Sequence, residues 1–548
     1  MTSLSQAFIA AAVAFDLDFQ KNLRPELVAR FGPPIVNIPN LHPGLRIHTM
    51  IGTSNSDRTV GIRTAFDWVT GAAPFNHKID AIVGAALSSI AERVAGTAEA
   101  YLVPQVSWGA TSASLSDKGL YPLFARAIPS DRLQGRAMWA WVQTFEIPSA
   151  IVVFSDEPYG SGLYDVILEE AESVQEEFRL DRVKTPFLAP RADGFNATVT
   201  LEAVQAIRAT GARFILLCMG TQASFYLYMM EQEGMLYSGE YQLLGPESLV
   251  LNEHLIGPSL GLPIGFQRMQ PAVEGPLFRR FADMWTNMTP DDVYGAEARA
   301  HYMLDEMQVT LEDAPARALV LEDFATVESL YSLGSFIFDA GYACVIAINE
   351  LLNAGAAPQN ITGKTLVEQI AATSFEGITG NVSFDASYDR LGAGFQLWNV
   401  REIGSVAHVG NVHFAPAASL ELLMDPIWVN GNASRLPPTS LQDCPYGWET
   451  DTRPGRCTPC AAGTGCGYDP EVGFPIGFLG PLYWQEVPIA TVIFDLDMRK
   501  HTEPALIERF GPPIIDIPHR HPDLKIRPMI GNTDAQVNSG VETALKWM

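Results

Sequence analysis

The chain contains an internal repeat, because residues 13–68 match residues 492–547 without a gap. VAFDLDFQK aligns with VIFDLDMRK, and ARFGPPIVNIPNLHPGLRI aligns with ERFGPPIIDIPHRHPDLKI. Phe15 and Phe494 set the offset at 494 − 15 = 479 residues. Roughly half of the aligned positions are identical, so a whole domain is repeated rather than a short motif. The sequence therefore predicts one large domain with a connector, followed by a truncated second copy that ends at Met548.

The composition is that of a globular protein and excludes some partners. Hydrophobic residues make up 47% and charged residues 18% of the chain, which gives ample material for a core. The net charge is −26 and no cluster of Lys and Arg stands out, so we expect no nucleic-acid partner. The apolar runs fall short of the roughly 20 residues that cross a bilayer, and the N-terminal run lacks a basic segment before it. We therefore expect no membrane span and no signal peptide in this fragment.

The six cysteines fall into two groups. Cys218 and Cys344 lie alone in apolar runs and are expected to be small buried side chains. The other four crowd into one Gly- and Pro-rich segment, and the disulfide candidates are Cys444, Cys457, Cys460 and Cys466. A single CxxC without a nearby histidine favours two disulfides, with three possible pairings, over the alternative of a zinc site. Disulfides are typical of an oxidising compartment.

Strands and helices alternate along the chain. Apolar residues recur at helical spacing from Leu4 to Phe19, which predicts an opening helix. The buried strands expected after it are 46–52, 81–84, 103–108, 150–155, 213–220 and 241–245. The expected helices are 88–101, 131–145, 161–178, 198–210 and 221–234. This pattern predicts an α/β fold with parallel sheets covered by helices on both faces, and about 430 residues suffice for two doubly wound lobes.

Copy two contains an element with no counterpart in copy one. PIGFLG, at residues 475–480, precedes the repeated helix of copy two and is typical of a buried strand followed by a turn. We therefore expect copy one to begin inside its domain. A bolder hypothesis is that this strand of copy two fills the place that copy one leaves open.

Polar side chains follow four of the expected strands, and a fifth opens the expected helix 131–145; ligands bind at such strand ends and helix starts in folds of this class. They are Ser88, Thr111, Asp131, Tyr159 and Glu247. Hydroxyls and free backbone N–H groups at helix starts bind anions. Two carboxylates and an aromatic ring suit an ammonium group. Together they indicate a site for an α-amino acid.

Each of these residues also has an ordinary structural explanation. Ser88 and Asp131 are good N-cap residues whatever they face. Tyr159 could simply pack over its turn, and Glu247 could be a solvated loop carboxylate. The binding hypothesis depends on their joint placement at successive carboxyl edges.

One long segment resembles a known receptor family. VPQVSWGATSASLSDKGLYPLFARAIPSD, followed by FSDEPYGSG, strongly resembles the ligand-binding region of class C G-protein-coupled receptors and natriuretic-peptide-type receptors, and above all the metabotropic glutamate receptors. The resemblance covers about residues 1–430, and residues 80–162 align without gaps. It implies a two-lobed periplasmic-binding-protein type I clamshell over residues 1–435. Lobe one would hold 1–128 and 265–394, and lobe two 129–264 and 395–430. A small cysteine-rich connector (436–472) and the truncated second copy (473–548) would follow.

The resemblance also implies roles for single residues. The hydroxyls of Ser88 and Thr111 would hold the α-carboxylate, Asp131 and Glu247 the α-amino group, and Tyr159 would supply the aromatic ring. Glu247 stands where the family usually has Asp, so its contact with the ammonium group is expected to shift or be lost.

Two further departures bear on selectivity. Leu333 stands where glutamate-selective members have a basic residue, so glutamate is disfavoured and an apolar or small polar amino acid is expected. Gly109 stands where the family has a second carboxylate-binding hydroxyl.

These observations predict an extracellular sensor module of a membrane receptor, in which lobe closure around a small ligand transmits a signal. A soluble solute-binding protein for amino-acid uptake is the alternative, and no motif indicates an enzyme or a cofactor. The membrane would be reached only through segments outside this fragment. The family resemblance implies a possible homodimer through lobe one.

Overall fold

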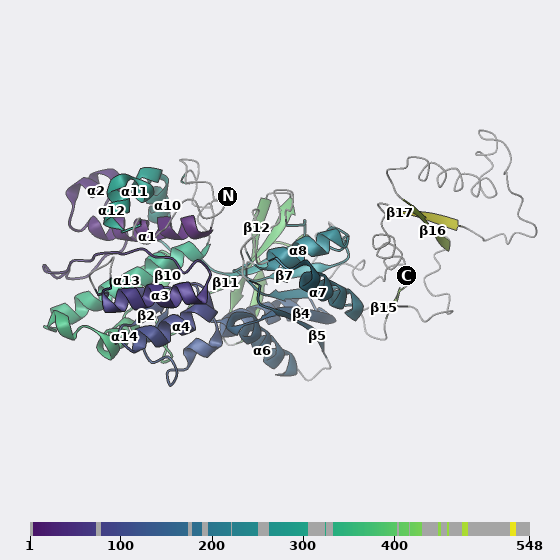
Figure 1. The fold of residues 1–548 in the computed structure, drawn as a ribbon, viewed down its shortest axis with the longest axis horizontal. Helices are drawn as coiled ribbons and strands as arrows, with labels where there is room; N and C mark the ends of the chain where they lie inside the picture. Colours follow the sequence, from purple (N-terminus) through teal and green to yellow (C-terminus); the bar gives the residue numbers. More distant parts are fainter. Residues whose placement is uncertain are drawn as a thin grey trace, which may run out of the picture. The chain divides into compact units, whose positions relative to one another are not determined.

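The computed structural model describes two units of the chain. The described residues are 4–72, 78–173, 178–188, 195–220, 222–249, 262–273, 275–304, 324, 332–402, 405–415 and 417–429, and the strands 448–450, 457–459, 474–480 and 526–532. The first unit comprises residues 1–442 with 453–456, and the second the remainder. Two lobes lie side by side within the first unit (Figure 1).

The first lobe is built on a small parallel sheet in the order β1-β2-β3. Its strands are β1 (Ile82–Val83), β2 (Gln105–Ser107) and β3 (Phe124–Arg126). Its helices are α1 (Leu4–Gln20), α2 (Pro25–Phe31), α3 (Arg58–Thr70), α4 (Ser88–Glu99), α10 (Phe278–Thr286), α11 (Pro290–Tyr294), α12 (Ala296–His301), α13 (Ser332–Asn353) and α14 (Gly363–Ala372). The 3-10 turns η1 (Ala113–Ser116) and η5 (Pro358–Asn360) and the hairpin β9 (Phe375–Gly377)–β10 (Gly380–Val382) complete it.

Helix α13 is the core helix of this lobe. It is long and apolar enough to cross a bilayer by length and composition, but most of it is buried inside the lobe. Helix α1 packs on it, and the Phe15 ring meets the Phe338 and Tyr342 rings edge-on at 6.4 and 5.4 Å. A side chain at Gly341 would lie 2.7 Å from the Phe15 ring. The contact between these helices therefore depends on a glycine.

The repeated FDLD motif has a structural role in α1. The fully buried Asp18 accepts hydrogen bonds from Lys21 Nζ (2.8 Å), Ile35 N (2.9 Å) and Tyr342 Oη (2.6 Å). Its carboxylate therefore ties three segments of the first lobe together. Loss of Lys21 would leave the buried Asp18 charge without its cation, which is costly to the fold.

The second lobe contains an eight-stranded sheet in the order β13-β12-β11-β8-β7-β6-β4-β5. The strands are β4 (Ser149–Asp156), β5 (Arg179–Pro186), β6 (Phe214–Cys218), β7 (Gln242–Gly245), β8 (Gln267–Pro271), β11 (Phe395–Glu402), β12 (Ser405–His413) and β13 (Ser419–Leu422). The helices are α5 (Asp131–Thr144), α6 (Pro158–Ser173), α7 (Ala197–Thr210) and α8 (Ala223–Gln232). Along β4, Val152 and Phe154 pack with α5 and α6, whereas Ile151 and Val153 pack with α7 and α8. Helices therefore cover both faces, as expected.

The two-lobed α/β architecture with mainly parallel strands is confirmed, with two corrections. Strands β11, β12 and β13 run antiparallel to their neighbours, so the second sheet is mixed rather than purely parallel. The expected lobe boundary at residue 265 is too early. Strand β8 pairs with β7 and β11 and so belongs to the second lobe, and the chain returns to the first lobe after Pro271.

In the second unit, β14 (Trp448–Thr450) pairs with β15 (Cys457–Pro459), and β16 (Phe474–Gly480) pairs in parallel with β17 (Ile526–Asn532). Residues 475–480 therefore form the expected strand. The hypothesis that this strand fills a place in copy one is wrong, because its partner is β17 of its own copy. Cys444, Cys460 and Cys466 lie outside the described residues, as does the side chain of Cys457, so the disulfides stay a prediction.

The offset of 479 aligns β17 with residues 47–53 of copy one. The expected strand 46–52 is not formed within the described part of the chain, which is a further correction. A strand requires backbone hydrogen bonds to a neighbouring strand. In copy two, β17 has such a neighbour in β16, whereas residues 46–52 of copy one pair with no described strand.

Candidate functional site

The five predicted site residues all follow strands at their carboxyl ends. Ser88 begins α4 after β1, and Thr111 follows β2. Asp131 begins α5 after β3, Tyr159 lies in the first turn of α6 after β4, and Glu247 follows β7. All five side chains are buried. The turns at these strand ends thus place hydroxyls on the first lobe and acidic groups with an aromatic ring on the second.

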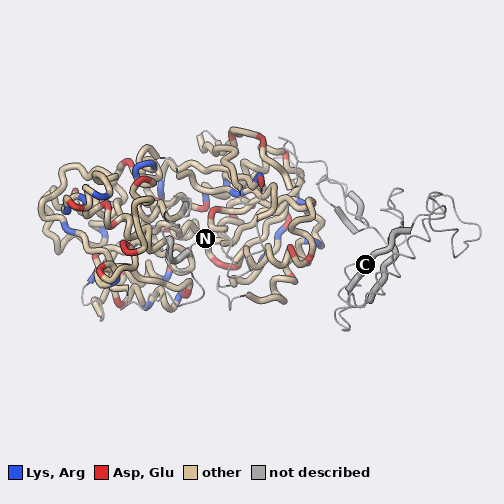
Figure 2. Tube along the Cα trace, turned by 90° about the horizontal axis from the view of Figure 1, so that it is seen from above, with Lys and Arg blue, Asp and Glu red and all other residues tan. Residues whose placement is uncertain are grey.

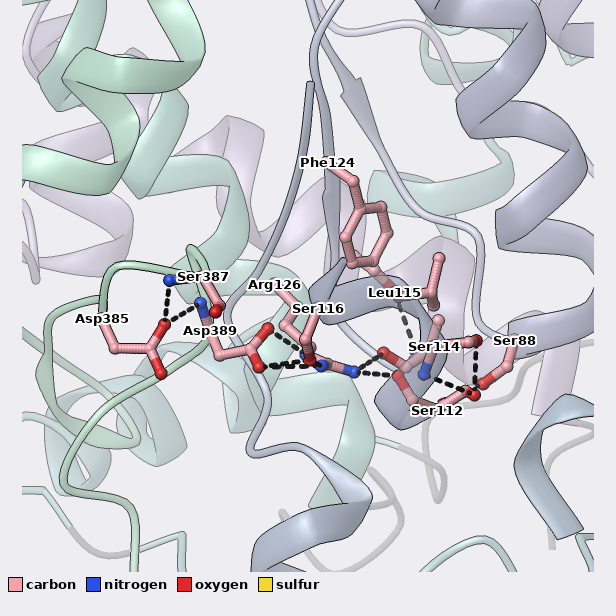
Figure 3. Close-up of polar contacts among 12 residues, drawn as sticks. Ser88, Ser112, Ser114, Leu115, Ser116, Phe124, Arg126, Asp385, Ser387 and Asp389 are labelled. Atoms are coloured by element: carbon pink, nitrogen blue, oxygen red, sulfur yellow. Dashed lines mark hydrogen bonds and ion pairs between the residues drawn. The ribbon is translucent and has the colours of Figure 1, made fainter. Parts of the chain in front are cut away.

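The first-lobe part of the site is a chain of hydroxyl contacts, drawn in Figure 3. Ser88 Oγ accepts from Ser112 N at 3.2 Å. Ser112 Oγ donates to the carbonyl of Pro158 in the second lobe at 3.0 Å and lies 2.8 Å from Ser114 Oγ. The N-cap position of α4 is Leu87 rather than Ser88. Ser88 therefore supports the loop at Ser112 instead of capping its own helix.

Gly109 gives this loop room to approach its neighbour. A Cβ atom at this position would lie 3.1 Å from Ala86 Cα and 3.3 Å from the Ala86 carbonyl oxygen. A hydroxyl-bearing side chain would push the two segments apart. Close packing thus explains why this position does not supply a second hydroxyl.

Asp131 is the most unusual residue of the site. Its backbone N–H donates to the Thr111 carbonyl at 2.8 Å. Its side chain is fully buried, and neither carboxyl oxygen makes a hydrogen bond of acceptable geometry to a described group. The α5 N-cap is Ser130, so the capping explanation does not account for this carboxyl either. Burial, and then the neighbouring Glu247, raises the pKa of Asp131 well above its ordinary value.

The Thr111 hydroxyl lies beside this carboxyl. Its proximity partly offsets the rise in the pKa of Asp131, yet Thr111 Oγ1 also makes no hydrogen bond of acceptable geometry within the described part of the chain. Two neighbouring buried polar groups therefore retain unused hydrogen-bonding capacity. Such groups in the interior of a protein call for an explanation, and a ligand is one.

Glu247 is held by second-lobe groups. Its carboxyl accepts from Gln134 Nε2 and from Tyr159 Oη, the latter at 3.3 and 3.4 Å, and Ser248 Oγ donates to Tyr159 Oη at 2.7 Å. Burial raises the pKa of Glu247 to about 7, although the hydrogen bond from Gln134 works in the opposite direction. The carboxyl thus changes charge near neutral pH.

The site has more acid than base. Arg126 is the cation that lowers the pKa of Asp131, and it already pairs with Asp389 at 2.7 Å. Elsewhere acidic and basic positions are interspersed along both lobes (Figure 2). Two neighbouring buried carboxyls without a cation of their own are costly to the fold and are characteristic of functional sites. They would bind a ligand that brings a positive charge and several N–H donors.

Sequence reasoning missed three contributors: Arg126, Gln134 and Ser248. Gln134 was detectable in principle, because it lies three residues after Asp131 and so on the same side of α5. Arg126 gave no signal of its role, since its partner Asp389 is 263 residues away. Leu333 lies in the first turn of α13 and is buried in the apolar core of the first lobe, so its part in selectivity stays a prediction.

Two further sequence predictions concern cysteines and metals. Cys218 and Cys344 are both free and buried, as expected. Among the residues that the structure describes, no group of three His, Cys, Asp or Glu side chains is placed to hold a metal ion.

The α/β fold with mainly parallel strands fits a receptor ligand-binding region. The family model for the receptor family ligand binding region matches residues 35–403, and the chain belongs to this family. Metabotropic glutamate receptor-like protein E from Dictyostelium discoideum is 24% identical over 403 residues, which are 72% of this chain. The chain spans 42% of that relative's length. The resemblance seen in the sequence is confirmed, and its family consists of ligand-binding receptors rather than enzymes.

Proposed function

We propose that residues 1–435 bind a small α-amino acid between the two lobes as the extracellular sensor module of a membrane receptor. Closure of the lobes would pass a signal through the cysteine-rich segment 436–472. The observation that carries this proposal is the buried Asp131 carboxyl, whose two oxygens and whose neighbour Thr111 Oγ1 keep unused hydrogen-bonding capacity.

The two ends of an amino acid find different partners in this arrangement. The ammonium group meets Asp131 and Glu247, whose charges it neutralises, and the Tyr159 ring. The carboxylate meets the hydroxyl groups of Ser88 and Thr111. Asp131 N is bonded to the Thr111 carbonyl, which keeps the two halves of the site close together.

Lobe closure is supported by a direct contact between the lobes. Ser112 Oγ donates to the Pro158 carbonyl at the start of α6, so the loop after β2 touches the helix that carries Tyr159. A ligand that contacts both sides has a higher affinity for the closed form than for an open one. Its binding therefore shifts the population towards closure.

The side chain of the ligand is expected to be apolar or small and polar. Leu333 offers no charge for a distal carboxylate. Glu247 reaches one methylene further than Asp would, and its carboxyl is already bonded to Tyr159 and Gln134. The ammonium contact is therefore expected to be dominated by Asp131.

Isothermal titration against the twenty amino acids tests the proposal. We expect at least one binder of micromolar to millimolar affinity, with L-glutamate among the weaker ligands. The decarboxylated and the N-acetylated forms of the best binder should each bind about 10- to 100-fold more weakly, since each loses charged hydrogen bonds. A panel without any binder would contradict the amino-acid assignment.

We also propose that two copies associate through the first lobe. Four large apolar side chains are exposed on α3 and near the end of α4: Ile62, Phe66, Tyr101 and Leu102. The Phe66 and Tyr101 rings lie 6.1 Å apart and form one apolar surface. Phe66→Glu should lower the dimer fraction in sedimentation velocity runs, whereas Leu423→Glu, at an exposed position of the second lobe, should not. A monomeric parent protein at high concentration would contradict the pairing.

A further inference from the structure

The buried Arg126 guanidinium holds the backbone on both sides of Thr111. Arg126 ends β3, and its side chain is fully buried. Nη1 donates to the carbonyl oxygens of Ala110 (3.3 Å) and Ser112 (2.8 Å), and Nη2 donates to Ser116 Oγ at 2.5 Å. One planar group thus fixes the position of the loop that carries Thr111 (Figure 3).

The same guanidinium is anchored to the segment that leads into the second lobe. Nε and Nη2 donate to the two Asp389 carboxylate oxygens at 2.7 and 2.9 Å, and Ser116 Oγ donates to the same carboxylate at 2.7 Å. The neighbouring Arg390 donates in return to the Ala127 carbonyl at 3.0 Å. The chain crosses between the lobes from β3 to α5 and again from β10 to β11. These contacts therefore tie the two connections together beside the site.

We infer that Arg126 is a positioning residue, which together with Asp389 orders the loop 109–116 for ligand binding and couples this loop to the connection at 389–395. Only the ligand-binding test of this inference rests on the proposed function; the hydrogen-exchange test does not. Arg126 need not touch the ligand, because its five N–H groups are directed at Asp389, Ser116 and the two carbonyls. A lysine cannot replace it, since one ammonium group cannot span a carboxylate and two carbonyls at once.

Hydrogen exchange on the ligand-free protein tests the ordering. In Arg126→Lys, the amides of residues 109–116 should exchange at least about 10-fold faster, while the second-lobe sheet stays protected. Arg280→Lys is the matched control, because Arg280 also donates to successive carbonyls of the first lobe, those of Pro33, Pro34 and Ile35. It should leave residues 109–116 unchanged. If Arg126→Lys does not fold, Asp389→Asn, which keeps the guanidinium, should show a smaller increase in the same amides.

A second readout separates positioning from a general loss of stability. In the parent protein, the tightest-binding amino acid of the titration panel is compared with its decarboxylated amine. Arg126→Lys should reduce the preference for the amino acid at least about 5-fold, because the displaced loop no longer meets the carboxylate. A uniform weakening of both ligands, or equal exchange in the two lysine variants, would overturn the inference. A blank panel with faster local exchange would instead remove the amino-acid assignment and leave the ordering role of Arg126 standing.

Discussion

At the scale of single residues, Asp131 is expected to lower the stability of the fold and to raise the affinity for the proposed ligand. Its carboxyl is buried, carries unused hydrogen-bonding capacity and lies near Glu247. Burial of such a group is unfavourable unless a partner arrives. Stability and ligand affinity should therefore respond to this residue in opposite directions.

The substitution Asp131→Asn should raise the melting temperature of the ligand-free protein and weaken the binding of the best amino acid. The lost charged hydrogen bonds are worth about 1.5–3 kcal/mol, or roughly 10- to 100-fold in affinity. Differential scanning fluorimetry and calorimetric titration measure the two effects. Asp165→Asn, at an exposed position of α6, should change neither quantity. An unchanged affinity for Asp131→Asn would remove this carboxyl from the ligand contacts.

The charge of Glu247 should make both stability and binding depend on pH. Because its folded pKa is raised from 4.5 to about 7, its contribution to stability is fully present below pH 4.5 and is lost as the pH rises through about 7. An ammonium ligand favours the ionised carboxyl, so its affinity should increase between pH 5 and 8. Titrations in buffers of different ionisation enthalpy should detect proton release at pH 6. Glu247→Gln should flatten the profile, and an equally steep profile in that variant would assign the titration to another group.

At the scale of elements, the predicted helices and parallel strands lie close to the observed ones. The misses have two different physical causes. Strand β5 is an edge strand with mostly half-exposed residues, so it has no continuous apolar run to mark it. Residues 46–52 have the pattern of a strand but lack a described pairing partner, and strand formation requires both.

In the candidate site, too, local features could be predicted from the sequence and distant contacts could not. Helix starts and strand ends are local properties, so Ser88, Thr111, Asp131, Tyr159 and Glu247 could be selected from the sequence. The contacts that orient them join residues far apart along the chain, such as Gln134 with Glu247. Such pairs cannot be predicted from the spacing of residues along the chain.

Gly265, just before β8, offers a prediction at the scale of elements. Gly265 has a φ of +88°, and an added Cβ would lie 2.2 Å from Val429 N and 2.3 Å from the Trp428 backbone. Gly265→Ala should therefore destabilise the second lobe by about 3 kcal/mol or more, since the positive φ is strained for Ala and the backbone of Trp428 and Val429 leaves no room for a Cβ atom. Chemical denaturation measures the loss. Gly96→Ala, in α4 with nothing within 4 Å, should be neutral or stabilising, and equal effects of the two changes would refute this explanation.

At the scale of the whole first unit, the two lobes meet in a contact that needs no ligand. Ser112 belongs to the loop after β2, and its hydroxyl reaches the carbonyl of Pro158. In the proposed closure, this bond belongs to the closed form alone. Its removal should act on the equilibrium between open and closed forms and leave each lobe intact.

Ser112→Ala should therefore weaken amino-acid binding by about 3- to 10-fold, the value of a neutral hydrogen bond. Small-angle X-ray scattering should also show a larger radius of gyration without ligand and a larger decrease on saturation. Thr97→Ala is the control, because its hydroxyl donates to the Arg93 carbonyl within α4 of the first lobe. Identical scattering curves for both variants and the parent would mean that this bond does not bias closure.

In the proposed receptor, the contact between Ser112 and Pro158 would also affect the sensitivity to ligand. Because part of the closing free energy comes from the protein itself, a fraction of molecules would occupy the active shape at rest. An agonist would then have to supply only the remainder, so under the proposed function a compound as small as a short-chain amino acid, with few atoms to contribute, would suffice to drive the response. The trade-off would be background signalling, which mutations at this single bond would raise or lower.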